Sequence, residues 1–130
     1  MTLVVMLHLA ILILHGLAHK EMAIDLSGSQ TVFVAVVIFL LPLVGIAFYW
    51  CGRERSGSLA IALSMSGALV FGIINHFVLS SPDNVMNLPE HPWRHPFALS
   101  ADLLAITELL AAILAFATLF LSVRRVPSMG

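Results

Sequence analysis

Four long apolar segments constrain the fold of this chain more than any other feature of its sequence. We predict membrane-spanning helices at residues 2–20, 31–50, 58–80 and 97–123. Each segment is close to or longer than the ~18–20 apolar residues that a helix needs to cross the hydrocarbon core of a bilayer. Membrane strands are not expected, because they need a closed barrel and an alternating pattern, which these segments lack. The sequence therefore predicts an all-α integral membrane protein in which residues 1–130 form one four-helix transmembrane domain.

The composition supports the same class of protein. Hydrophobic residues make up 60% of the chain and charged residues 10%, whereas a soluble protein is about half apolar and a quarter charged. The formal net charge of -1 argues against a nucleic-acid partner. The single cysteine, Cys51, excludes an intrachain disulfide and a multi-cysteine zinc site within one chain. No basic residue precedes Lys20, so we interpret the first apolar segment as a membrane helix and not as a targeting signal.

The links between the segments predict the topology. Short links favour antiparallel neighbours, so we expect an up-down-up-down bundle in the lipid bilayer. The link from Ser81 to Pro96 holds four prolines and is not expected to form a regular helix. One end carries Arg53, Arg55, Arg124 and Arg125, and the other carries Lys20 and Arg94. Because cytoplasmic loops are enriched in basic residues, we expect both termini on the cytoplasmic side of a bacterial or archaeal cytoplasmic membrane.

Three histidines form a stripe on the first predicted helix. His8, His15 and His19 are seven and four residues apart, and a helix advances about 100° per residue, so all three lie within about 20° of one line. Polar side chains inside a bilayer are costly and usually face the interior of a bundle. The HxxxH spacing of His15 and His19 also allows two imidazoles to reach one metal ion. The alternative is that each histidine only bonds a backbone carbonyl or a neighbouring helix.

Further polar groups fall at similar depths on the other segments. His76 is nearly level with His15, and Glu108 is nearly level with His8 near the middle of the bilayer, by the ~1.5 Å rise of a helix. We predict a metal site in the outer half of the bundle from the residues that carry imidazole or carboxylate groups there. These candidate ligands are His15, His19, His76, His91, His95, Asp102 and Glu108.

The predicted ion is copper or zinc, with iron as a further option, because imidazole suits all three metals. Met22 and Met86 lie near these histidines in the sequence, and thioethers favour Cu(I). The protein would then handle a transition metal or carry out metal-assisted redox chemistry. The usual Glu-x-x-His repeats of di-iron bundles are missing from the sequence.

Three other interpretations remain open at this point. A haem b could be held axially by His15 and His76 on facing helices. The chain could instead be a small accessory subunit of a larger membrane complex, or a homo-oligomer. Finally, His8 and Glu108 could form an acid–base pair that acts on a lipid-soluble small molecule. The sequence leaves open whether the protein is an enzyme, since it lacks the phosphate-loop, Ser-His-Asp and CxxC motifs.

Overall fold

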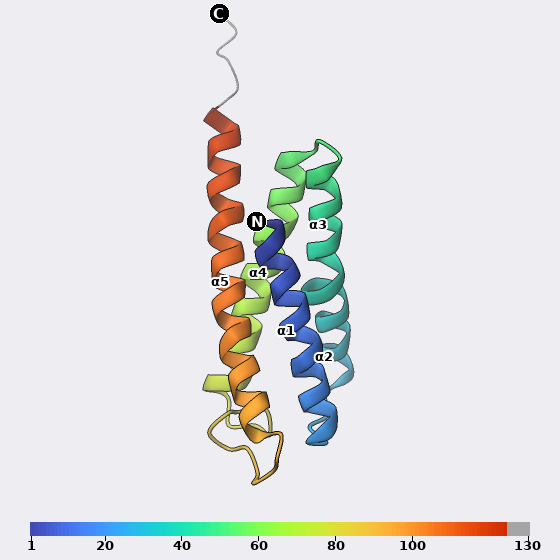
Figure 1. The fold of residues 1–130 in the computed structure, drawn as a ribbon, viewed down its shortest axis with the longest axis vertical. Coiled ribbons are helices and arrows are strands. Elements are labelled where there is room, and N and C mark those ends of the chain that lie inside the picture. Colours follow the sequence, from blue (N-terminus) through green and yellow to red (C-terminus); the bar gives the residue numbers. More distant parts are fainter. Residues whose placement is uncertain (125–130) are drawn as a thin grey trace, which may run out of the picture.

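The structure is a computed structural model that describes residues 1–124, and these form four helical spans and no strand. The spans consist of α1 (Thr2–Glu21); α2 (Gly28–Phe33), η1 (Val34–Leu40) and α3 (Leu41–Trp50); α4 (Glu54–Ile73) and η2 (Ile74–Val78); and α5 (Arg94–Arg124). Successive spans run antiparallel, and the start of α1 lies toward the same end of the bundle as the α3–α4 turn (Figure 1). The all-α class and the four predicted helices are therefore confirmed.

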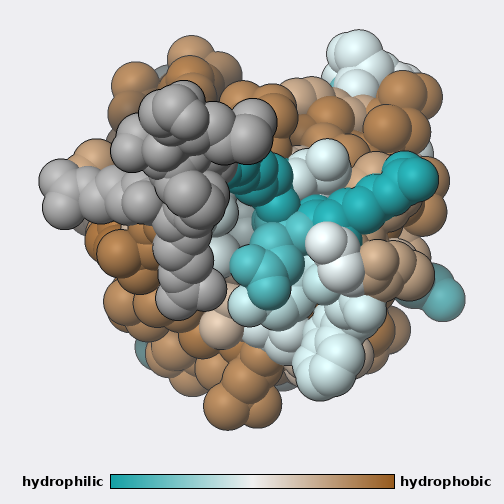
Figure 2. All heavy atoms as spheres, turned by 90° about the horizontal axis from the view of Figure 1, so that it is seen from above, coloured by the Kyte–Doolittle hydropathy of each residue, from teal (hydrophilic) through white to brown (hydrophobic). Residues whose placement is uncertain are grey.

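The outer surface of the bundle is largely apolar. All four spans are long and apolar enough to cross a membrane, and large hydrophobic side chains such as Leu63 and Ile113 are exposed along them. Hydrophilic groups gather at the end of the bundle seen in Figure 2, inside a hydrophobic perimeter. The predicted orientation rests partly on Arg125, which lies outside the described residues, so the cytoplasmic placement of the termini stays a prediction.

Three of the four spans begin earlier than the apolar pattern indicates. Helix α2 starts at Gly28 because the Ser27 side chain accepts from the Gln30 backbone N–H while Gln30 accepts from the Ser27 N–H, a capping box. Helix α5 starts at Arg94, so Pro96 lies in its first turn. Proline is tolerated there because its missing N–H has no intrahelical partner. The expectation that the whole link through Pro96 lacks regular helix was therefore wrong at its last residues.

Two of the spans contain π-helical segments, and proline accounts for the first. The Leu41 N–H bonds Val36 O, five residues back, at the end of η1. Pro42 cannot donate the next bond of this type, to Val37 O, and that carbonyl instead accepts from Ser64 Oγ at 2.6 Å. In η2 the Leu79 N–H bonds Ile74 O at 2.8 Å. Such π-bulges occur frequently at functional sites, and η1 and η2 both border the cavity described below.

The interior has two distinct parts. Near the α3–α4 turn, buried apolar residues of three helices form one cluster: Val5, Leu9, Ile61, Ala62, Met65, Ala111, Ala112 and Ala115. At the other end the polar side chains His15, His76 and Ser100 are buried together with Phe97. We call this second part the loop end, because the α1–α2 link (residues 22–27) and the α4–α5 link (residues 79–93) cover it. The histidine site lies there.

Candidate metal centre

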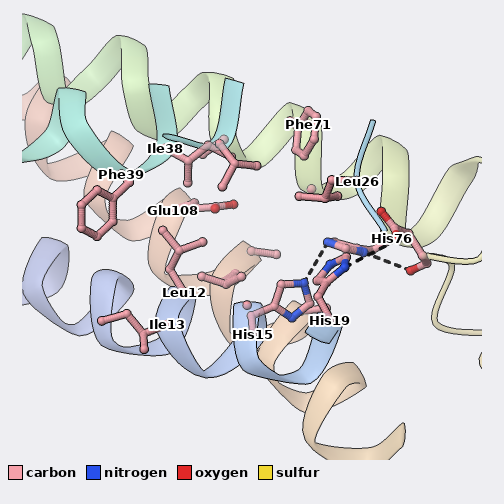
Figure 3. Close-up of a pocket in the computed structure, with 18 of the residues that line it drawn as sticks. Leu12, Ile13, His15, His19, Leu26, Ile38, Phe39, Phe71, His76 and Glu108 are labelled. Carbon is pink, nitrogen blue, oxygen red and sulfur yellow. Dashed lines mark hydrogen bonds and ion pairs between the residues drawn. The ribbon is translucent and has the colours of Figure 1, made fainter. Parts of the chain in front are cut away.

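Three histidines converge at the loop end. His15 and His19 lie on successive turns of α1, and His76 lies in η2. One ring nitrogen of each lies within 4.8 Å of the others, and Nε2 of His15 is 3.2 Å from Nε2 of His76 (Figure 3). The side chain of His19 is 11% exposed, and the other two residues are almost fully buried. We refer to His15, His19 and His76 as the histidine triad.

Each ring of the triad is anchored through Nδ1. His19 Nδ1 donates to Ile24 O at 2.9 Å, and His76 Nδ1 donates to Asp83 O at 3.0 Å, since a carbonyl can only accept. His15 Nδ1 lies 2.8 Å from Ser100 Oγ, which also lies 2.9 Å from Phe97 O. The Ser100 hydroxyl either donates to Phe97 O and accepts from His15 Nδ1, or donates to His15 Nδ1. The neutral His19 and His76 rings therefore carry their proton on Nδ1 and leave Nε2 as a ligand atom, and His15 has two possible tautomers.

The contact between His15 and His76 depends on the His15 tautomer. With its proton on Nε2, His15 donates a hydrogen bond of 3.2 Å to the unprotonated Nε2 of His76. With its proton on Nδ1, both Nε2 atoms are free to bind one cation, which takes the place of that proton. Two nitrogen ligands of a tetrahedral zinc ion, each about 2.0–2.1 Å from the metal, lie roughly 3.3 Å apart. The separation in the structure therefore matches that of two imidazoles sharing one ion.

The anchoring groups come from the chain on either side of the helices. Helix α1 ends in a Schellman-type turn, in which the Ile24 N–H bonds His19 O at 3.0 Å and Ala23 adopts a φ of 52°. A left-handed conformation costs an alanine about 1–2 kcal/mol, and here it brings the Ile24 carbonyl against the His19 ring. On the other side, the Val85 N–H bonds His76 O at 3.0 Å. This bond folds the α4–α5 link back so that the Asp83 carbonyl reaches His76.

Phe97 and Asp83 complete the surroundings of the triad. The fully buried Phe97 ring lies with its centroid 4.6, 4.8 and 5.6 Å from those of His15, His19 and His76. The Asp83 carboxylate oxygen Oδ1 is 3.9 Å from His19 Nδ1, and Asp83 is 6% exposed. A buried carboxylate beside neutral imidazoles favours a cation in the site. Asp83 and Ser100 were not among the predicted ligands, since neither belongs to a recognisable spacing.

The other candidate ligands are placed elsewhere in the structure. His91, His95 and Asp102 are exposed, and none of them belongs to the cluster of potential ligands found among residues 1–124. Glu108 is buried but also lies outside this cluster. Their part in a metal site stays a prediction.

A cavity of about 410 Å³ joins the triad to Glu108. The three histidines line it at one place, and Glu108 projects into it from α5 at another (Figure 3). His8 Nδ1 lies 3.8 Å from Glu108 Oε1, so the two residues matched by depth are neighbours. That distance exceeds a hydrogen bond.

The anchoring of His15 gives a specific prediction. We expect Ser100→Ala to weaken metal binding by about 10–100-fold, because the partners that orient ligating histidines typically contribute this much to affinity. The matched control is Ser122→Ala, because Ser122 Oγ donates to the carbonyl three residues back on α5, as Ser100 Oγ can. Ser122 lies at the other end of the bundle, where its carbonyl accepts from Arg55 in the first turn of α4. Competition titration with a chromogenic chelator measures both. Equal affinities in the two variants would mean that Ser100 does not orient a ligand.

Comparison of the chain with protein-family models, with curated proteins and with solved structures finds no match.

Proposed function

We propose that this chain is an integral membrane protein that binds one transition-metal ion through His15, His19 and His76. The observation that carries the proposal is the convergence of three imidazoles, each with Nδ1 held by an oxygen, and with Nε2 of His15 only 3.2 Å from Nε2 of His76. Ligating histidines characteristically donate their other N–H to an oxygen in this way.

Zinc is the metal that the site supports best. Three imidazoles with one open position form a common zinc arrangement in sites that bind a further ligand. The sequence argument for copper rested on thioethers, but Met86 is 82% exposed and Met22 packs in an apolar cluster with Ala18 and Phe97. Copper remains the second choice, since imidazole alone suits it well, and iron the third. The Asp83 carboxylate supplies negative charge near a bound dication.

The geometry does not favour haem b. Axial ligation by His15 and His76 requires the plane of the macrocycle between the two rings. Their Nε2 atoms are 3.2 Å apart, which leaves no room for that plane. No observation among the described residues specifically supports an accessory subunit or a homo-oligomer.

Metal analysis of the full chain tests the proposal. The protein is purified from membranes in a mild detergent without chelators, and its metal content and absorption spectrum are measured on one sample. We expect one equivalent of zinc or copper per chain and no Soret band. A protein that stays metal-free after dialysis against micromolar Zn²⁺ and after incubation with Cu(I) under reducing conditions would contradict the proposal. A Soret band would replace the proposal with haem binding.

A further inference from the structure

The cavity beside the triad has the size and lining of a small-molecule site. Its volume of about 410 Å³ falls in the range of roughly 300–1,000 Å³ typical of such pockets. Apolar side chains form most of its wall, with Leu12 from α1, Ile38 from η1, Phe71 from α4 and Leu104 from α5. An apolar body would therefore be well accommodated between the helices.

The cavity opens on the side of the bundle. Helix α1 packs on α5, and α3 packs on α4, while α1 and η1 contribute facing walls of the cavity. Lining residues on both of these elements reach the outer surface, where Ile13 is 59% and Phe39 is 41% exposed. In a spanning bundle this opening faces the hydrocarbon chains of the bilayer. A molecule dissolved in the membrane could enter there without crossing water.

One acidic group inside the cavity has no hydrogen-bonding partner among the described residues. Glu108 is 3% exposed and points into the cavity (Figure 3). Its nearest basic atom, His8 Nδ1, is 3.8 Å away, and both ring nitrogens of the fully buried His8 also lack hydrogen bonds. A buried carboxyl group without a partner costs free energy. A ligand that carries a hydroxyl group would satisfy it.

We infer that the cavity binds a lipid-soluble alcohol, which enters between α1 and η1 and whose hydroxyl group hydrogen-bonds Glu108. An apolar chain or ring system fits the wall of the cavity, and one neutral oxygen fits its isolated carboxyl group. A permanently charged head group fits less well, because the rest of the wall offers few polar groups to replace its water. This binding does not depend on a metal ion in the triad.

Photolabelling with a defined probe tests the inference. The full chain in lipid nanodiscs is labelled with hexadecanol carrying a diazirine at mid-chain, with the triad either metal-free or loaded with Zn²⁺. The matched probe is a hexadecane with the same diazirine and no hydroxyl group. We expect saturable labelling of α1 and η1 by the alcohol. Glu108→Leu should weaken its apparent affinity by about three- to tenfold, the effect of one lost hydrogen bond, and leave the hydrocarbon probe unchanged.

Two glycines offer a second, matched pair of variants. A Cβ added at Gly16 or at Gly28 meets no atom within 4 Å, but only Gly16 lines the cavity. Gly16→Phe should fill the opening and reduce saturable labelling at least tenfold, while Gly28→Phe should leave it unchanged. Unaltered labelling of Gly16→Phe, or an equal effect of Glu108→Leu on both probes, would overturn the inference. Metal content, measured on the same samples, reports separately on the triad.

Discussion

Replacing both His15 and His19 with alanine is expected to abolish stoichiometric metal binding while the four helices still form. Of the three imidazoles that converge, only His76 would remain. A single protein ligand does not bind a metal ion tightly enough to compete with the water ligands of the free ion. We expect affinity to fall by more than about 100-fold, which is the upper end of the effect of removing an orienting partner alone. Competition titration measures the affinity, and circular dichroism measures the helix content.

The fold should survive this change because other contacts hold α1 in place. Val5 and Leu9 pack with residues of α4 and α5 in the apolar cluster near the α3–α4 turn, and Trp50 Nε1 donates to Thr2 Oγ1 at 3.2 Å. These contacts lie away from the loop end. Loss of helix content together with metal would therefore point to a structural role for the two histidines, and the titration would then be repeated with His76→Gln alone.

His91 in the α4–α5 link and His95 in the first turn of α5 provide the matched control. His91→Ala combined with His95→Ala removes the same number of imidazoles, but both side chains are exposed. His91 Nδ1 accepts from the Trp93 N–H at 3.2 Å within its own turn. We expect unchanged affinity and stoichiometry in this variant. Metal loss there, with full binding in the His15 and His19 variant, would move the site to the α4–α5 link and the first turn of α5.

The sequence predicted part of this site because helix geometry is periodic. A spacing of four residues places His15 and His19 on one face of α1, and the apolar lengths place His76 at the same level on the antiparallel α4 span. The same argument paired His8 with Glu108, whose side chains lie 3.8 Å apart. The depth of a residue in the bundle and the helix face that it occupies can thus be predicted from sequence wherever the residue lies on a long regular helix.

The groups that anchor the triad were not predictable in this way. Two of them are the backbone carbonyls of Ile24 and Asp83, which every residue type possesses. Their positions depend on the positive φ of Ala23 and on the bond from Val85 to His76 O. Such loop conformations depend on local contacts and not on hydrophobic periodicity.

Gly57→Ala is expected to destabilise the fold strongly, because the backbones of α3 and α4 are in close contact there. A Cβ at Gly57 would lie 2.6 Å from Gly45 O and 2.6 Å from Tyr49 N. Both are backbone atoms, so the two helices would have to move apart. Overpacking of this kind typically costs about 1–3 kcal/mol, and small residues at such crossings are what allows membrane helices to pack closely.

Gly67→Ala is the matched control on the same helix. There the new Cβ would lie 3.6 Å from a Val37 side-chain atom and 3.7 Å from Phe33, which is ordinary contact. Alanine is also preferred over glycine inside a helix by roughly 0.5–1 kcal/mol, so this variant should be as stable as the parent chain or more stable. Unfolding by SDS in mixed micelles, followed by circular dichroism, compares the two. Equal midpoints would mean that α3 and α4 are not in close backbone contact at Gly57. The position of η1 in the wall of the cavity would then differ as well, because η1 continues directly into α3.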